Sequence, residues 1–197
     1  YHLDLLQNPS VFFIVDRTDL EEQLNDEFNA LDITKPEVIE SIAHLKRVIR
    51  HDNYKGKRGL MIALVHKFRP GELEEVEEEL KKVQNKQETL SSRQNVISFI
   101  DEGHRTQYGQ LAGQMKRILG ENTFRFAFTG TPVSRPDKGA DTYREFSYLP
   151  DEKYLDKYFI TDSINDGFTV KISYKPALDN VKGIHLDREK LDTFLEA

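Results

Sequence analysis

Four short runs of predominantly apolar residues constrain the fold of this chain more than any other feature. Residues 11–15 and 60–65 are apolar throughout, and residues 96–100 and 124–128 are apolar except for Ser98 and Arg125. A strand made almost entirely of apolar residues is typically buried on both faces, as in a parallel sheet covered by helices. Because helix-like patterns separate the runs, the sequence predicts an α/β fold with right-handed crossovers.

Four other segments have apolar residues at helical spacing. They are residues 18–31, 36–49, 69–93 and 108–119. The first begins with Thr18 and Glu21 at the spacing of a capping box, and the last is expected to end at Gly120. The third is so rich in Glu, Lys, Gln and Ser that it predicts a solvated helix followed by a mobile loop.

The character of the sequence changes after Pro132. Asp166-Gly167 predicts a turn, and residues 168–174 alternate between apolar and polar side chains, which predicts a half-exposed strand. Residues 187–197 predict a short helix. The first residues resemble the end of a helix, so we expect the chain to be a piece of a longer protein.

Composition narrows the class of protein. The net charge is −6, whereas nucleic-acid-binding proteins are usually basic, so any DNA contact must come from a local patch. There is no cysteine, which excludes disulfides and Cys-ligated zinc and fits a cytoplasmic location. No apolar run approaches the roughly 20 residues that span a bilayer, so we expect no membrane contact.

Polar residues follow three of the predicted strands. Ligands of an open parallel sheet bind beyond the carboxyl ends of its strands, so we expect these residues to share one rim of the sheet. They are Asp16, Asp101, Glu102, Thr129, Gly130 and Thr131.

The types of residue on this rim suit phosphoryl transfer, which requires a metal-binding group and a group that orients the attacking water. Asp101 suits Mg²⁺, held through a metal-bound water, and Glu102 suits the role of general base. His104 can form a hydrogen bond toward the turn at residues 129–131. The alternative is a solvent-facing Asp-Glu pair that caps a helix, but His104 and the turn favour catalysis.

The phosphate-binding loop of ATPases is absent from this sequence. Its pattern, G-x-x-x-x-G-K-[ST], would precede the first strand. The only Gly-Lys pair is Gly56-Lys57, but Arg58 follows it and His51 occupies the place of the first glycine. We therefore expect the isolated chain to be inactive in ATP hydrolysis.

Two turns carry candidate DNA-binding residues. Arg17 and Thr18 lie at a strand-to-helix turn, where a helix N-terminus helps to hold a phosphate; the alternative is simple N-capping by Thr18. Lys67 and Phe68 follow the strand at residues 60–65, where ordinary solvated cations are the alternative. Residues 150–153 match a nuclease Asp/Glu/Lys cluster only faintly, and a surface turn is favoured there.

The motifs together resemble the motor region of the restriction (R) subunit of type I restriction-modification enzymes, within the superfamily-two helicases and translocases. Residues 11–20 resemble the family's motif Ia, residues 100–109 its Walker B motif and following helix, and residues 128–132 its motif III. Residues 158–174 resemble the segment that precedes the second motor domain. The resemblance covers about residues 9 to 178.

This resemblance implies a RecA-like fold of the P-loop NTPase type, in which residues 1–180 form part of the first motor domain and residues 181–197 lead toward the second. It implies ATP and Mg²⁺ as cofactors and double-stranded DNA as a partner. The full-length parent would be an ATP-dependent type I site-specific deoxyribonuclease. The modification and specificity subunits would bind through parts that are absent here.

The sequence departs from the family pattern in two places. Gly103 stands where family members usually have Ala or Cys, and we expect glycine to be tolerated and to add flexibility. Ala63 and Leu64 replace two threonines, so two hydroxyl groups that could contact DNA are missing. Two alternatives remain open: a non-catalytic RecA-like nucleic-acid-binding module, and a DNA helicase without nuclease activity.

Overall fold

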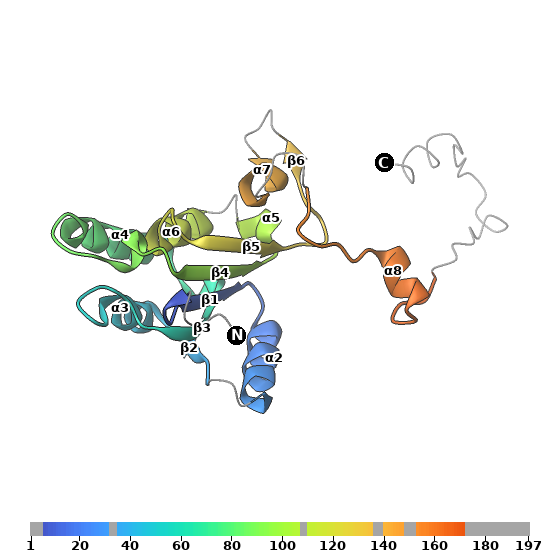
Figure 1. The fold of residues 1–197 in the computed structure, drawn as a ribbon, viewed down its shortest axis with the longest axis horizontal. Helices are drawn as coiled ribbons and strands as arrows, with labels where there is room; N and C mark the ends of the chain where they lie inside the picture. The colour runs from blue at the N-terminus through green and yellow to red at the C-terminus, as the bar shows by residue number, and fades with distance from the viewer. Residues whose placement is uncertain (1–5, 32–34, 107–109, 136–139, 148–152, 172–197) are drawn as a thin grey trace, which may run out of the picture. The chain divides into compact units, whose positions relative to one another are not determined.

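The computed structural model describes residues 6–31, 35–106, 110–135, 140–147 and 153–171 (Figure 1). The chain divides into two compact units, Tyr1–Leu155 and Asp156–Ala197. The predicted helix at residues 187–197, the strand residues 172–174 and most of the 150–153 cluster lie outside the described residues. The predicted domain boundary at residue 180 does too.

A five-stranded, fully parallel sheet forms the centre of the first unit. Its strands, in spatial order, are β2 (Glu37–Ile39), β3 (Gly59–Leu64), β1 (Ser10–Val15), β4 (Val96–Asp101) and β5 (Phe124–Phe128). Each predicted apolar run is one of these strands. The predicted α/β fold with a parallel sheet flanked by helices is therefore confirmed.

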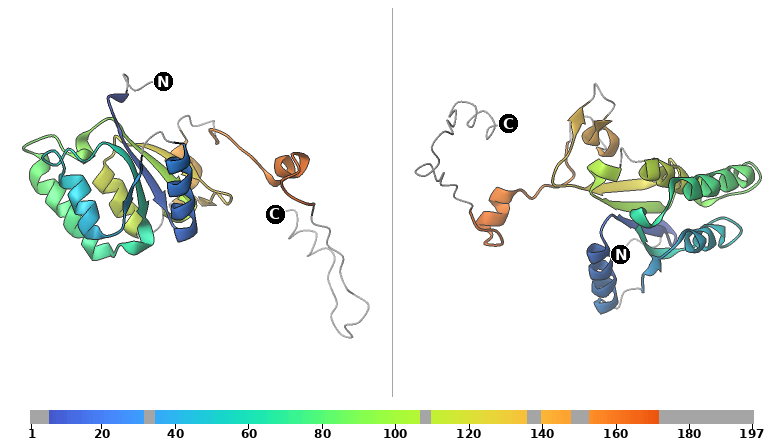
Figure 2. Two further views of the ribbon diagram at one scale, coloured as in Figure 1. Left: turned by 90° about the horizontal axis from the view of Figure 1, so that it is seen from below. Right: turned by 180° about the vertical axis from the view of Figure 1, so that it is seen from behind.

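Helices cover the two faces of the sheet unequally (Figure 2). Helices α3 (Ile42–Arg50), α4 (Pro70–Gln84) and α6 (Gln110–Leu119) pack on one face and form the main core, which includes Phe12, Ile14 and Met61. Helix α2 (Thr18–Ala30) packs on the other face against Val15, Ile62 and Leu64. The alternation of side chains along β1 thus supplies both cores.

A ladder of phenylalanine rings crosses the sheet on the α2 face. The ring centroids of Phe13 on β1 and Phe99 on β4 lie 4.8 Å apart, and those of Phe99 and Phe126 on β5 lie 5.2 Å apart. Phe13 also contacts Phe28 of α2 edge to face. The rings follow the pairing of the strands, since Phe99 lies opposite both Phe13 and Phe126.

The predicted helix at residues 36–49 is wrong over its first part. Residues Glu37–Ile39 form β2, which pairs with β3, and the helix begins only at Ile42. The Ser41 side chain caps this helix by accepting a hydrogen bond from the His44 backbone N–H at 3.3 Å. The β-branched residues Val38 and Ile39 suit an edge strand, and their apolar pattern is too short to distinguish strand from helix.

The predicted capping box at Thr18 is also wrong. Arg17 is the N-cap residue of α2, and its side chain makes no capping hydrogen bond. Thr18 is the first residue of the helix itself, and its side chain is exposed.

The segment at residues 69–93 is packed more closely than its polar composition predicts. Helix α4 buries Leu73, Val76, Leu80 and the carboxylate-bearing Glu77. After the helix, a short 3-10 turn (Leu90–Ser92) leads to Arg93, which is only 2% exposed. The last part of the predicted mobile loop, residues 89–93, therefore packs into the core, whereas residues 84–86 and Glu88 are exposed.

Buried Arg93 connects three segments at the amino ends of the strands. Its Nη1 donates to Ser10 Oγ and to the Lys55 carbonyl, each at 2.8 Å. Its Nε and Nη2 donate to Asn95 Oδ1 at 3.0 and 2.8 Å. The guanidinium thus joins the start of β1, the loop before β3 and the residue before β4.

Short elements complete the first unit. They are α5 (Gly103–Thr106), β6 (Ser134–Arg135), β7 (Ala140–Asp141) and α7 (Thr142–Phe146). The predicted end of the fourth helix at Gly120 is confirmed, because α6 ends at Leu119 and Gly120 has φ +96°. No helix in the described ranges is long and apolar enough to cross a membrane.

Among the described residues of the second unit, 156–171, there is one short helix, α8 (Ile160–Asn165). The predicted turn at Asp166-Gly167 is confirmed, since Asp166 caps this helix and Gly167 has φ +79°. Residues 168–171, the described part of the predicted half-exposed strand, are not a strand. Phe168 and Val170 are more than four-fifths exposed there.

Candidate functional site

The carboxyl ends of the central strands gather the predicted polar residues on one rim. Asp16 follows β1, Asp101 ends β4 and Thr129 follows β5. The register places the strand ends side by side, because Ile14 pairs with Ile100 and Asp101 pairs with Phe128. The expectation that these residues share a rim is confirmed.

The Asp101 carboxyl lies where negative charge is unfavourable. Partial burial raises its pKa above the ordinary value, and the neighbouring charges of Glu102 and Asp16 act in the same direction. A backbone hydrogen bond from Glu102 and the charge of Arg17 oppose this rise without cancelling it. A cation bound here would relieve the repulsion.

The backbone turns sharply directly after β4. Glu102 has φ +49°, in the left-handed region that a non-glycine residue adopts only at a cost. The next residue, Gly103, is buried against β5 so closely that an added Cβ would lie 2.6 Å from Ala127 Cβ. The close packing on Ala127 gives glycine a steric role at this position, and the expectation that it adds flexibility stays a prediction.

His104 connects the β4 turn to the loop after β5. Its Nδ1 lies 2.7 Å from Thr129 Oγ1 and 3.3 Å from Glu102 Oε2, while its Nε2 lies 3.3 Å from Thr131 Oγ1. The Thr131 backbone N–H also donates to Thr129 Oγ1 at 3.1 Å. The predicted contact between His104 and the 129–131 turn is confirmed, and a continuous chain of polar contacts runs from Glu102 to Thr131.

The donor set around Asp101 limits which metal it can hold. Among the described residues, no group of three or more His, Cys, Asp or Glu side chains could enclose a metal ion. Mg²⁺ is usually bound by one or two carboxylates, with waters and substrate phosphates as its other ligands. A half-buried carboxylate in a region of excess negative charge fits that mode.

The candidate DNA-binding residues lie in different environments. Arg17 and Thr18 are exposed at the N-terminus of α2, and Arg17 is near enough to influence Asp101. Lys67 is also exposed, but its Nζ lies 3.4 Å from Glu21 Oε2. Phe68 is 3% exposed and belongs to the main core, so its ring is not presented to a ligand.

Some residues at this rim carry no signal in the sequence. His66 Nδ1 lies 2.9 Å from the Asp16 carbonyl oxygen and so links the ends of β3 and β1. Ala127 belongs to the site because Gly103 packs against it. Thr142 belongs to it because its side chain accepts a hydrogen bond from Val133, which follows the 129–131 turn. Each contact joins residues from different elements, and no local motif marks it.

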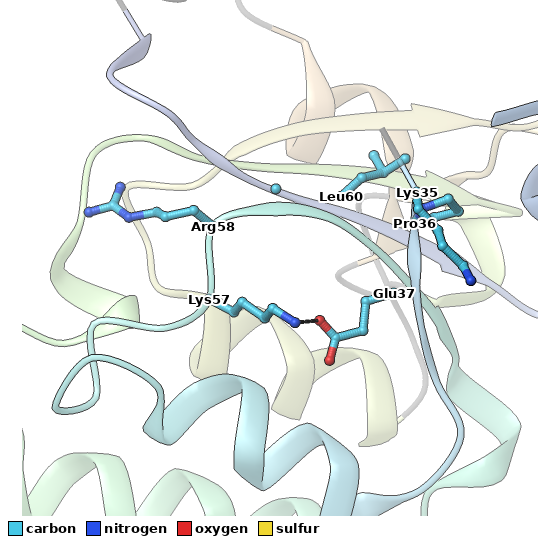
Figure 3. Close-up of a pocket in the computed structure, with 7 residues that line it drawn as sticks. Lys35, Pro36, Glu37, Lys57, Arg58 and Leu60 are labelled. Atoms are coloured by element: carbon cyan, nitrogen blue, oxygen red, sulfur yellow. Dashed lines mark ion pairs between the residues drawn. The ribbon is translucent and has the colours of Figure 1, made fainter. Parts of the chain in front are cut away.

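A shallow pocket lies at the opposite rim, between the starts of β2 and β3 (Figure 3). Lys57 and Glu37 form an ion pair across it, whereas the charged ends of Arg58 and Lys35 point away from this pair. Because the cations diverge, the pocket presents no focused charge to a ligand. The chemistry-bearing residues are on the other rim.

Known proteins resemble this chain over most of its length. A putative type I restriction enzyme endonuclease subunit, MjaVIIP, from Methanocaldococcus jannaschii is 37% identical over 188 residues, which cover 83% of this chain. The MjaVIIIP subunit from the same organism is 32% identical over 86% of the chain. The HindI endonuclease subunit from Haemophilus influenzae is 29% identical over 95% of the chain. The resemblance to type I restriction subunits is confirmed.

The chain spans 17% of the length of each of these relatives. The model of the SWI2/SNF2 ATPase family matches residues 2–197, which is nearly the whole chain. The parallel sheet with helices on both faces agrees with the RecA-like fold of such motors. The chain therefore belongs to the SWI2/SNF2 ATPase family.

Proposed function

We propose that this chain supplies the Walker B and coupling motifs of the first motor domain in the DNA-translocating, DNA-cleaving subunit of a type I restriction enzyme. The observation that carries the proposal is the polar chain from Glu102 through His104 to Thr129 and Thr131. It connects a candidate general base on one strand to the loop of the next strand. The similarity to type I restriction endonuclease subunits supports the nuclease parent.

The roles of the rim residues follow from their positions. Glu102 accepts a proton from the water that attacks the γ-phosphorus of ATP, while the bond from phosphorus to the ADP oxygen breaks. His104 lies between Glu102 and Thr129, so it keeps the Glu102 carboxylate aligned and couples the position of that carboxylate to the position of the 129–131 loop. Movement of that loop thereby accompanies hydrolysis.

Asp101 would hold Mg²⁺ through a bound water. The ion, when bound, neutralises charge on the transferring phosphoryl group. Burial and, to a smaller extent, the charges of Glu102 and Asp16 raise the Asp101 pKa in this chain, and a bound cation would lower it again, which supports that role. ATP and Mg²⁺ are thus the proposed cofactors.

The open edge of the sheet at β5 could accept the strand that leads into the missing phosphate loop. Within the described ranges, β5 pairs only with β4, and Phe124 and Phe128 are 55% and 58% exposed. An open edge of a sheet accepts a further strand. We infer that a strand of the parent, leading into its phosphate loop, completes the sheet there, and that the isolated chain does not hydrolyse ATP.

DNA binding is proposed for the exposed turn residues alone. Arg17 and Thr18 lie at a helix N-terminus, which favours a phosphate, and Lys67 lies at the end of the neighbouring strand β3. Double-stranded DNA, the modification and specificity subunits and a cytoplasmic location belong to the proposal for the parent. Phe68 does not, because it is buried.

The test is a pair of substitutions in the full-length parent. Glu102→Gln keeps the shape of the side chain but cannot accept a proton, so hydrolysis should fall by about two to four orders of magnitude while nucleotide binding persists. Asp101→Asn should instead weaken the binding of Mg-ATP, since it removes charge near the metal. Steady-state hydrolysis and nucleotide affinity are measured for both variants.

Glu78→Gln is the matched control, because Glu78 is an exposed residue of helix α4 and does not belong to the rim. It should leave both measurements unchanged. If Glu102→Gln kept more than about a tenth of the parent's turnover, well outside the range for a lost general base, the catalytic role of Glu102 would be refuted.

A further inference from the structure

Helix α7 contacts the loop that follows β5. Thr142, its first residue, is 4% exposed and forms two reciprocal hydrogen bonds with Val133. The Thr142 backbone N–H donates to the Val133 carbonyl at 2.8 Å, and the Val133 N–H donates to Thr142 Oγ1 at 3.1 Å. Val133 is two residues beyond Thr131, so these bonds fix the far end of the 129–131 turn.

The other end of α7 contacts the turn after β4. Phe146 packs against the main core, and its Cε2 lies 3.7 Å from where a Cβ on Gly103 would be. Gly103 is itself wedged against Ala127 of β5. Phe146 thus lies beside the backbone that directs Glu102 toward the rim.

An ion pair between Glu145 and Lys116 connects α7 to α6. Helix α6 is joined in turn to α4, because Arg117 Nε donates to Glu77 Oε2 at 2.7 Å. Glu77 is 7% exposed, and its pKa lies below the ordinary value: burial raises it, but the hydrogen bonds from Lys81 and Arg117 outweigh burial. Helix α7 therefore rests on a helical layer that is itself firmly held.

We propose that α7 is a brace that sets the spacing between the two loops of the site, and that Thr142 is a positioning residue for ATP hydrolysis. This inference rests on the proposed function, since it concerns the same loops. The two hydrogen bonds at Val133 hold Thr129 within reach of His104, and His104 in turn holds Glu102. When the bonds at Thr142 are lost, the 129–131 turn shifts and Glu102 loses its alignment.

The physical reason is the steep dependence of catalysis on position. A displacement of about 1 Å, caused far from the chemistry, can lower a rate by about a hundredfold. Binding of the nucleotide depends mainly on contacts elsewhere, such as the phosphate loop, and changes little. A positioning role therefore predicts a loss of kcat with KM for ATP retained.

The experiment uses the full-length parent with Thr142→Val and Thr142→Ser. Valine keeps the shape but cannot accept the hydrogen bond from Val133, whereas serine keeps the acceptor. Thr142→Val should lower kcat for ATP hydrolysis by about tenfold to a hundredfold, with KM changed less than about threefold. Thr142→Ser should restore most of the rate.

Arg144→Ala, on the exposed side of the same helix, is the control and should behave as the parent does. If Thr142→Val does not accumulate in folded form, Phe146→Leu gives the same measurement without removing a hydrogen bond. If a folded Thr142→Val variant has the same kcat as the parent, the proposed brace is refuted, even if the thermal midpoint of the variant falls. The brace is also refuted if Thr142→Ser loses as much kcat as Thr142→Val does.

Glu102→Gln, measured in the same parent, separates the two proposals. If that variant hydrolyses ATP normally, the proposed function fails regardless of Thr142. If it is inactive and Thr142→Val is fully active, the proposed function stands and only the brace is refuted.

Discussion

The two rims of the central sheet are built on opposite electrostatic principles. At the amino ends, the buried Arg93 directs its donors at neutral oxygens of Ser10, Lys55 and Asn95. At the carboxyl ends, Asp101 lies close to two further carboxylates and to one opposing cation, Arg17. The buried charge at the amino ends is thus held by neutral oxygens, while the carboxyl ends bring several carboxylates close together.

The pKa shifts express this contrast. Burial lowers the pKa of the Arg93 guanidinium to about 10, and the nearby Arg58 acts in the same direction, but the group stays charged at neutral pH. Burial and neighbouring charge raise the pKa of Asp101. The difference separates a rim whose buried charge is held by neutral acceptors from the rim at which we propose the catalytic site. Three predictions can break or sharpen this comparison.

The largest expected effect is at Arg93. Arg93→Met fills a similar volume but removes the donor of Ser10 Oγ and of the Lys55 carbonyl, at about 1–3 kcal/mol for each acceptor that is fully buried, while Asn95 Oδ1 keeps a hydrogen bond from Arg58. Relief of the desolvated charge offsets part of this cost, so we expect a net loss of about 2–3 kcal/mol in the free energy of unfolding.

Chemical denaturation followed by circular dichroism measures the Arg93 effect. Arg47→Met, on the exposed side of α3, is the matched control and should change stability by less than about 0.5 kcal/mol. Equal stability of the two variants would show that Arg93 does not hold the amino rim together.

A smaller effect is expected at the carboxyl rim, where Gly103 packs on Ala127. Gly103→Ala introduces a Cβ 2.6 Å from Ala127 Cβ, and overpacking of this kind costs about 1–3 kcal/mol. Adding Ala127→Gly removes the clash and should recover much of the lost stability. The four variants of this double-mutant cycle are compared by thermal unfolding, and purely additive losses would contradict the contact.

The smallest effect concerns Asp101 and has a defined dependence on pH. The folded state raises the pKa of Asp101 and so holds its proton more tightly than the unfolded chain does. Stability from this group is therefore present below the unfolded value of about 3.9 and is lost as pH rises through the folded value.

Asp101→Asn should accordingly raise the thermal midpoint of this chain slightly at about pH 7, and the gain should vanish below about pH 4. Asp26→Asn, on the exposed face of α2, controls for the loss of one negative charge. If Asp101→Asn lowered the midpoint at neutral pH, the carboxyl rim would not carry the strain described here.

The parts of the molecule that the sequence predicts well are those with a local pattern. The apolar runs predict β1, β3, β4 and β5. Burial on both faces of the sheet explains the runs of the central strands, whereas β5 keeps its pattern although Phe124 and Phe128 are exposed. The carboxylates and hydroxyls that follow these runs predict the rim. Parallel strands bring their ends together without any further information.

Contacts between distant residues are the parts that the sequence leaves open. In the sequence, Arg93 cannot be distinguished from the other charged residues of its polar segment, because its hydrogen-bond partner Ser10 lies 83 positions away. The fit of Gly103 against Ala127 and the bonds of Thr142 depend likewise on the folded structure. In β2, Val38 and Ile39 continue a helical pattern, and only pairing with β3 makes them a strand.

The stacked rings of Phe13, Phe99 and Phe126 have a mechanical consequence. They join β1, β4 and β5 by face-to-face contacts in addition to the hydrogen bonds of the backbone, and Phe99 lies only two residues before Asp101. Closely packed interiors resist deformation, so these three strands behave as one stiff plate. If the proposed motor role holds, we expect changes of shape to be taken up beyond the plate, in the turns that begin at Glu102 and Thr129.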